Sequence, residues 1–258
     1  IDDLRVYNRA LSDNEILRLA GGAPCPTDGT TWDTAFRDLQ CGLSAATSGD
    51  QIWIGEGIYK PGSNLFQSFV LKNGVTLFGG FLGLTANTKE TALSQRPAFN
   101  AASPLVTLTG DLFGNDGPAA FEDYGENTTR VVVATANTAA TMDTLRIRGG
   151  SATRDAPFHA GGGLRIFGNA NVTLNSVVFL GNRASTDGGA VASISPLQVS
   201  ASHFISNRAE QDGGAIAITG TLQVAGTVFT GNFAREGGAV AARGPAKVQG
   251  SLFSLQQM

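Results

Sequence analysis

Three acidic residues recur at nearly one spacing, each directly before a Gly-Gly doublet: Asp187, Asp212 and Glu236. If the fold stacks them, their carboxylates repel one another unless a cation lies between them. Calcium takes oxygen ligands from carboxylates and turn carbonyls, so these residues are candidate calcium ligands. We favour the alternative that an acidic residue before Gly-Gly opens a turn, without metal or cofactor. Nearby arginines would then relieve the repulsion: Arg183, Arg208 and Arg235.

The same region contains few residues that could act as catalytic acids or bases. Cleavage of a glycosidic bond needs two carboxyl groups at a fixed separation, and the runs "AVASI", "AIAIT" and "AVAAR" after the doublets contain none. His203 occupies a position that is apolar in the neighbouring repeats, which indicates a spacer. His159 stands in a loop, and a general base there has no supporting neighbours. We therefore predict no catalytic residue in the repeats.

The less regular stretch between about residues 65 and 160 leaves an enzymatic alternative open. Loops on a rigid scaffold often carry catalytic residues. A polysaccharide lyase or glycoside hydrolase could use a groove lined by Lys72, Asp143, Arg146, Arg148 and His159. An acidic patch of Asp111, Asp143 and Asp155 is a further hypothesis, although solvated turn residues are commoner.

A repeat in the sequence predicts the structural elements that would position these residues. Gly-Gly doublets begin at residues 161, 188, 213 and 237, at intervals of 27, 25 and 24. Phenylalanines recur at intervals of 25, 25 and 24: Phe179, Phe204, Phe229 and Phe253. A period near 25 without a helical pattern inside it is typical of one coil of a parallel β-helix. Strand-like runs from Gln51 onward agree with this all-β interpretation.

Residues one coil apart then become neighbours in columns. The phenylalanines are expected to stack inside the coils. Asparagines follow three residues later, at a corner where their amides would bond from coil to coil: Asn182, Asn207 and Asn232. The first glycine of each doublet suits a corner with positive φ: Gly188, Gly213 and Gly237. Gln256 departs from the pattern, because asparagine is expected there.

The N-terminal part divides into three segments. Residues 1–20 include the capping-box sequence of a helix from Ser12 to Leu19, and residues 21–31 read as a linker. Residues 32–258 are predicted to form the β-helix. Its capping helix is expected in residues 32–46, where Trp32, Phe36, Leu39 and Leu43 fall at helical spacing. Cys25 and Cys41 are either a disulfide of an exported protein or two free thiols; neither belongs to a CxxC zinc motif.

Several motifs in order carry a resemblance over residues 30 to 258: "TTWDTAFRDLQCGLSAATSGDQIWIGEGIYKP", "NGVTLFGGFLG", "LTGD", and repeated "GGA[VI]" with "F-x-x-N-x-A". They resemble bacterial right-handed parallel β-helix proteins of the pectin-lyase-like fold, in particular the polymorphic outer-membrane protein type. "DDLRVYNRALSDNEI" resembles the closing strand and helix of a laminin-G-like, concanavalin-type jelly roll. The resemblance implies an exported, surface-displayed scaffold. We expect the chain to be a fragment truncated at its C-terminus, because the last coil would otherwise expose an open strand edge.

Composition excludes other classes of function. The 258 residues include 34 glycines, only 15% charged residues and a net charge of −3, so nucleic acid is not an expected partner. No apolar run reaches the length of about 18 residues that a membrane helix needs. We predict a non-catalytic scaffold or adhesin, secreted or held at a bacterial cell surface or outer membrane, that binds glycans or host and matrix proteins.

Overall fold

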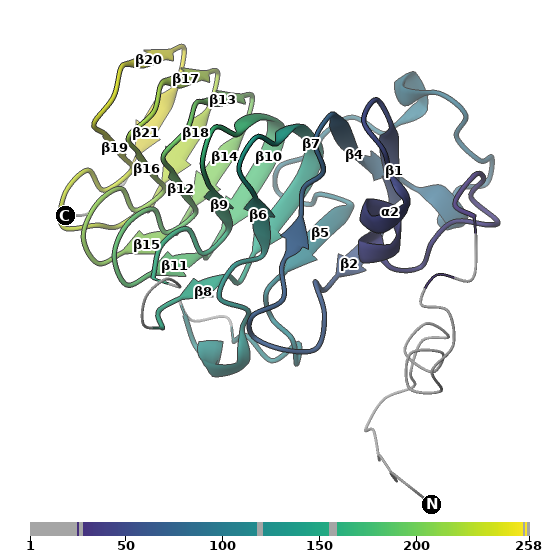
Figure 1. Cartoon of the computed structure of the whole chain (residues 1–258), viewed down its shortest axis with the longest axis horizontal. Coiled ribbons are helices and arrows are strands. Elements are labelled where there is room, and N and C mark those ends of the chain that lie inside the picture. Colours follow the sequence, from purple (N-terminus) through teal and green to yellow (C-terminus); the bar gives the residue numbers. More distant parts are fainter. Residues whose placement is uncertain (1–24, 26–27, 118–120, 155–158, 255, 257–258) are drawn as a thin grey trace, which may run out of the picture.

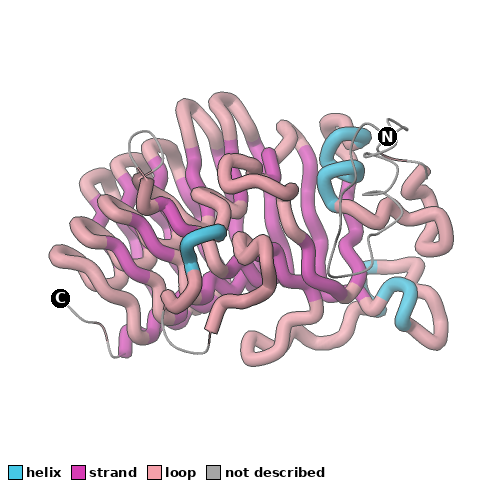
Figure 2. Tube along the Cα trace, turned by 90° about the horizontal axis from the view of Figure 1, so that it is seen from below, coloured by secondary structure: helices cyan, strands magenta, loops and turns pink. Residues whose placement is uncertain are grey.

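The computed structural model describes residues 25, 28–117, 121–154, 159–254 and 256. Over these residues the chain winds into coils of short strands, which lie one above another along the long axis of the molecule (Figure 1). Viewed at right angles, the strands form a regular succession from the N-terminal to the C-terminal end (Figure 2). The prediction of an all-β parallel β-helix is confirmed, because every strand pairing in the described part is parallel.

The described strands form three parallel sheets. The largest is built from β1 (Gln51–Gly55), β2 (Gly57–Tyr59), β4 (Val75–Phe81), β5 (Val106–Thr109), β7 (Ala139–Arg148), β10 (Asn171–Leu180), β13 (Leu197–Ser200), β14 (His203–Ile205), β17 (Leu222–Ala225), β18 (Val228–Thr230), β20 (Ala246–Gln249) and β21 (Leu252–Ser254). The second contains β3 (Phe69–Val70), β6 (Val132–Ala134), β9 (Leu164–Ile166), β12 (Val191–Ser193), β16 (Ile216–Ile218) and β19 (Val240–Ala242). The third contains β8 (Ser151–Ala152), β11 (Arg183–Ala184) and β15 (Arg208–Ala209).

The register of the sheets follows the repeat seen in the sequence. Phe204 in β14 pairs with Phe179 in β10 and with Phe229 in β18. In the second sheet, Val191 of β12 pairs with Ile216 of β16. Inward-facing apolar side chains of the two larger sheets fill the space inside the coils, so each coil buries its core against the coils on either side.

A left-handed residue bends the largest sheet in successive coils. This position has positive φ, from 47° to 57°, in Thr144, Ser176, Ala201, Gly226 and Gly250. It falls inside the long strands β7 and β10, but in later coils it separates β13 from β14 and β17 from β18. The bend turns one strand into two arms, and the chain can then close around the core.

The N-terminal helix is shorter than the sequence predicted. Helix α2 runs only over Leu39–Ala45, because Asp38 caps it by accepting a hydrogen bond from the Gln40 amide at 2.8 Å. The preceding residues form turns in which Thr31 and Thr34 bond each other's backbone and side chain. The helix prediction is therefore wrong for Trp32 and Phe36. Trp32 instead packs on Phe81, with ring centroids 5.4 Å apart.

Short 3-10 turns complete the described elements: η1 (Gly83–Thr85), η2 (Leu93–Gln95) and η3 (Tyr124–Glu126). A disulfide joins Cys25 to Cys41 in α2, with the two Cα atoms 5.6 Å apart. The predicted helix from Ser12 to Leu19 and the jelly-roll-like tail of residues 1–20 lie outside the described residues. In the described part, no helix combines the length and the apolar character needed to cross a bilayer.

Candidate functional site

The predicted phenylalanine column is a continuous stack. Ring centroids are 4.9 Å apart between Phe179 and Phe204, 5.0 Å between Phe204 and Phe229, and 4.7 Å between Phe229 and Phe253. The first three rings are fully buried, whereas Phe253 is 45% exposed. The near-parallel rings follow from the register, since each pairs with its counterpart one coil away.

The asparagines form a second continuous column at the corner before the third sheet. The amide of Asn182 donates to Asn207 Oδ1 at 3.1 Å, and the amide of Asn207 donates to Asn232 Oδ1 at 3.0 Å. Gln256 extends the column, because its Oε1 accepts from the Asn232 amide at 3.2 Å. All three asparagines are fully buried, and their amides also bond backbone groups of the neighbouring coils. The one departure in the sequence pattern thus keeps the amide chemistry of the column.

The first glycine of each doublet is needed at the next corner for two separate reasons. Gly188, Gly213 and Gly237 have φ values of 62°, 62° and 58°, in the left-handed region that glycine tolerates best. A Cβ at each would also collide with a backbone carbonyl three residues later. These glycines therefore have a structural role, because they allow the chain to turn at this corner.

The three members of the acidic column have different surroundings, and Asp187 Oδ1 is buried without a hydrogen-bond partner. Asp212 bonds Arg243 Nη2 at 2.6 Å, and Glu236 is exposed. The arginines expected to relieve the repulsion lie elsewhere: Arg183 covers the ring of Tyr124 and Arg208 covers that of Phe233, while Arg235 is exposed. For Arg183 and Arg208 that expectation is wrong, because their guanidinium groups lie over aromatic rings, and the ion pair of Asp212 is made by Arg243.

The residues of the enzymatic alternative are held in separate contacts. Asp143 bonds Arg96 Nη1 at 2.7 Å, and Arg146 donates to the Ala102 carbonyl at 3.1 Å. Arg148 forms an ion pair with Asp116. Lys72 is exposed after β3, and the carbonyl of His159 accepts from Thr186. We find no pair of free acid and base among these described side chains.

His203 occupies the apolar position predicted for it. It pairs in register with Val178 and Val228, and its ring centroid lies 6.4 Å from that of Phe99. Partial burial lowers the pKa of His203, which favours the neutral imidazole. A neutral ring is what a spacer between two valines requires.

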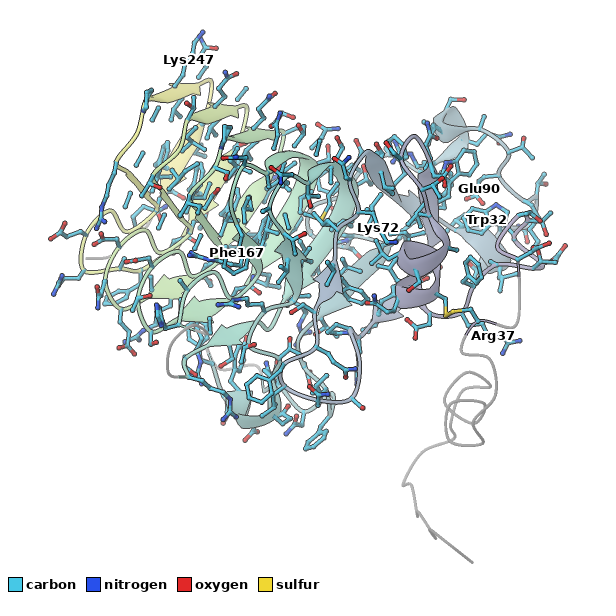
Figure 3. The ribbon with its side chains drawn as sticks, viewed as in Figure 1. Trp32, Arg37, Lys72, Glu90, Phe167 and Lys247 are labelled. Carbon is cyan, nitrogen blue, oxygen red and sulfur yellow. A yellow bond between two sulfur atoms is a disulfide. The ribbon has the colours of Figure 1, made fainter. Side chains whose placement is uncertain are left out.

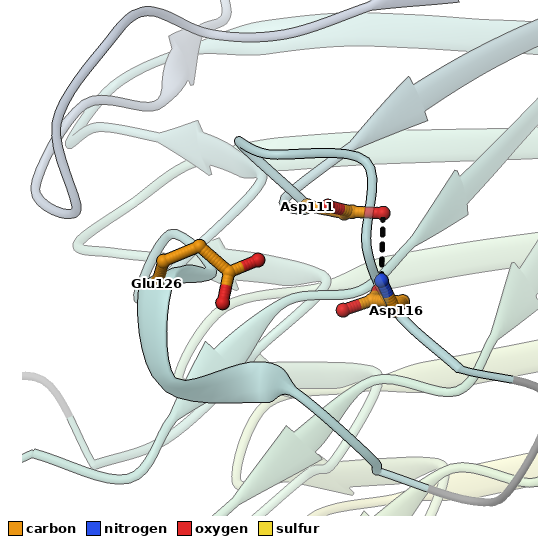
Figure 4. Close-up of side chains that lie close together, drawn as sticks. All are labelled: Asp111, Asp116 and Glu126. Carbon is orange, nitrogen blue, oxygen red and sulfur yellow. Dashed lines mark hydrogen bonds between the residues drawn. The ribbon is translucent and has the colours of Figure 1, made fainter.

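Three carboxylates converge instead in the loop between β5 and β6. Asp111 follows β5, Asp116 lies in the loop, and Glu126 ends η3; their ligand oxygens lie within 4.8 Å of one another (Figure 4). Asp111 accepts hydrogen bonds from the amides of Gly114, Asn115 and Asp116. Among the described residues, this is the group whose carboxylate oxygens could surround one metal ion.

Burial sets the electrostatics of this cluster. The Asp116 side chain is only 2% exposed, and desolvation raises its pKa to about 6. This value is the net result, in which hydrogen bonds from Asn127 and Arg148 lower the pKa of Asp116 and the nearby Asp111 carboxylate raises it. Arg148 Nη2 lies 3.3 Å from Asp116 Oδ2 and 3.7 Å from Asp111 Oδ2.

The sequence pointed to one member of this cluster and missed two. Asp111 was expected to meet Asp143 and Asp155, but Asp143 pairs with Arg96, and Asp155 lies outside the described residues. Asp116 and Glu126 belong to a stretch without a repeat, so no column predicts where they lie. The usable signal is local: "DLFGNDG" places two aspartates at the end of a strand, where a loop must turn.

A cleft of about 1220 Å³ opens at the N-terminal end of the coils, between the turns of residues 28–38, helix α2 and strand β1. Trp32, Trp53 and Tyr59 contribute aromatic surface to its wall. Trp32 and Glu90 lie together at this end, far from Lys247 at the other (Figure 3). Glu90 accepts from the amides of Leu82 and Gly83, so this carboxylate has a structural role.

Comparison with known proteins identifies the type of coil. Residues 176–194 match the model of the Chlamydia polymorphic membrane protein repeat. The matched segment contains one member of each column: Phe179, Asn182 and Gly188. No curated protein and no solved structure matches the chain. The coils therefore include a repeat of this type in a parallel β-helix, and the match does not reach residues 1–20, for which the resemblance to a jelly roll remains a prediction.

Proposed function

We propose that the chain is part of a non-catalytic β-helix scaffold, exported to the cell surface, that binds glycans or host and matrix proteins. The observation that carries this proposal is the match of residues 176–194 to a repeat of the polymorphic membrane proteins, in register with the buried columns. That repeat is named after membrane proteins, which supports a place at the surface or outer membrane.

Two features of the molecule support the proposal. The disulfide between Cys25 and Cys41 fits an oxidising compartment outside the cytosol. The charged residues that a polysaccharide-cleaving groove would need are engaged in separate ion pairs and backbone contacts. Both favour display and binding over catalysis.

The N-terminal cleft is the surface on which we expect the ligand. Binding sites are usually concave and lined by aromatic side chains with a few polar groups, and here Trp32, Trp53 and Tyr59 share the wall with Gln51 and Asp50. Trp53 stacks on Phe81 with centroids 4.7 Å apart, so its ring is held in one orientation. A fixed aromatic face suits the apolar face of a sugar ring or an aromatic side chain of a protein.

The test is a binding screen of the purified full chain on a glycan array and on immobilised matrix proteins. We expect saturable binding to at least one glycan or protein, and no release of unsaturated or reducing ends from pectic polysaccharides. Trp53→Leu should weaken the binding at least tenfold. The matched control is Phe113→Leu, since Phe113 is 76% exposed and does not line the cleft. Efficient polysaccharide cleavage would overturn the proposal.

A further inference from the structure

The loop that holds the carboxylate cluster also gathers buried oxygen atoms without a hydrogen-bond partner. Four of the buried oxygens without a partner in the described residues belong to this loop: Asp116 Oδ1, Glu126 Oε1, Asn127 Oδ1 and Thr128 Oγ1. A buried acceptor without a partner is costly, and native proteins retain few of them. Four such oxygens within one short segment point to a positively charged ligand.

Asn127 gives evidence that does not depend on the carboxylates. Its side-chain nitrogen donates to the Gly149 carbonyl at 2.7 Å and to Asp116 Oδ2 at 3.2 Å. Both partners are acceptors in these bonds, so turning the amide over would place its oxygen, another acceptor, against both of them. Asn127 is 2% exposed, and its Oδ1 is therefore held beside the cluster with no donor.

The charge of the cluster is also unbalanced. Three carboxylates face one guanidinium in contact, that of Arg148, which leaves a formal charge of −2 when all are ionised. Asp116 is the most secluded of the three, since its side chain is 2% exposed. Buried charges of one sign need a partner of the other.

We propose that Asp111, Asp116, Glu126 and Asn127 form a calcium site that fastens the β5–β6 loop to the coils. Calcium takes six to eight oxygen ligands at about 2.3–2.6 Å, so two ligands of one ion lie up to about 5 Å apart. The observed limit of 4.8 Å between the carboxylate oxygens agrees with this size. Magnesium binds at about 2.0–2.1 Å in a rigid octahedron and fits this spacing less well.

The position of the site explains what the ion would do. Arg148 belongs to β7, and the Gly149 carbonyl that holds Asn127 follows directly after that strand. On the other side of the loop, Tyr124 in η3 donates to the Gly181 carbonyl of the next coil at 2.6 Å. An ion between Asp116 and Glu126 therefore joins the loop to two successive coils.

The experiment measures calcium binding to the full chain after removal of metal with EDTA. Isothermal titration and thermal unfolding with CaCl₂ up to about 10 mM cover the weak affinities of extracellular sites. We expect one saturable binding event and a melting temperature several degrees higher with calcium. Magnesium at the same concentration and matched ionic strength should give a smaller shift. Absence of both heat and shift would mean that water occupies the loop, and would overturn the proposal.

Two substitutions locate the ion. Asp116→Asn and Glu126→Gln keep the shape of each side chain, and each should weaken calcium binding at least tenfold. Asp212→Asn is the matched control from the acidic column and should leave calcium binding unchanged. Because Glu126 is only partly buried, its variant provides the test if the Asp116 variant fails to fold. Equal calcium affinity in all three variants would contradict this location.

Discussion

Individual side chains stabilise this protein through contacts with the equivalent residues one coil away. Asn207 shows this most clearly, since its amide serves Asn232 Oδ1 and the Phe179 carbonyl, while its own Oδ1 accepts from the Asn182 amide and backbone. One side chain thus satisfies polar groups of the two neighbouring coils in a buried corner. Such a network is stable only while every member is present.

Replacing Asn207 by alanine should therefore destabilise the protein strongly. The change removes the acceptor of the Asn182 backbone N–H and the side-chain donor to the Phe179 carbonyl, and a buried group left without a partner costs about 1–3 kcal/mol. We expect Asn207→Ala to lower the free energy of unfolding by at least about 2 kcal/mol, measured by urea denaturation. Asn171→Ala, at the exposed start of β10, is the matched control and should change it by less than about 0.5 kcal/mol. Equal effects would contradict the role assigned to the column.

At the scale of elements, the bend in the largest sheet imposes a backbone conformation that alanine tolerates poorly. Ala201 has φ of 47° and is exposed, while glycine occupies the same position in the next two coils as Gly226 and Gly250. A left-handed conformation costs an ordinary residue about 1–2 kcal/mol. A substitution at Ala201 can therefore relieve backbone strain between β13 and β14.

Ala201→Gly should stabilise the fold. We expect a gain of about 0.5–1 kcal/mol, because relief of the strain exceeds the added entropy of glycine in the unfolded chain. Ala225→Gly is the control: Ala225 is also exposed but lies in β17 with ordinary strand geometry, so the same change should cost about 0.5–1 kcal/mol. Opposite signs in thermal or urea unfolding are the expected result. A loss of stability in both variants would contradict the strain.

The elements also show which parts of the fold the sequence could predict. Phe204, Asn207 and Gly213 recur at one period, and a column of like residues identifies both the coil and the neighbours of each residue. The bend escaped prediction because its residues change from threonine to serine, alanine and glycine. The N-terminal helix was extended too far because helical spacing at Trp32 and Phe36 could not reveal that Asp38 caps the helix.

The candidate site was less predictable for a related reason. The β5–β6 loop occurs once, so nothing in the period places Asp116 beside Glu126. Their proximity depends on how η3 folds back, through the bond of Tyr124 to Gly181, onto a coil that comes later in the chain. Contacts of this kind are properties of the folded loop, and the local pattern of residues does not specify them.

At the scale of the whole molecule, the regular coils and the columns of like residues that join them make the protein a stiff rod. Each coil contacts the coils before and after it, and the stability of such a solenoid is the sum of coil and interface terms. A rod of this kind separates its ends by a fixed distance, which suits a protein that presents a cleft at one end. Catalysis would require acid–base groups gathered in a groove, and Asp143, Arg146 and Arg148 are held in separate contacts.

The most direct test of this account is cross-linking between coils. Ile205 and Thr230 are partners in register on neighbouring strands, so Ile205→Cys with Thr230→Cys should form a disulfide under mild oxidation, detected by mass spectrometry of tryptic fragments. Ile205→Cys with Ser254→Cys, two coils apart at roughly 10 Å, should not. Rapid cross-linking of the first pair alone is the predicted result. No cross-link in the first pair, or equal cross-linking in both, would contradict the stacked coils.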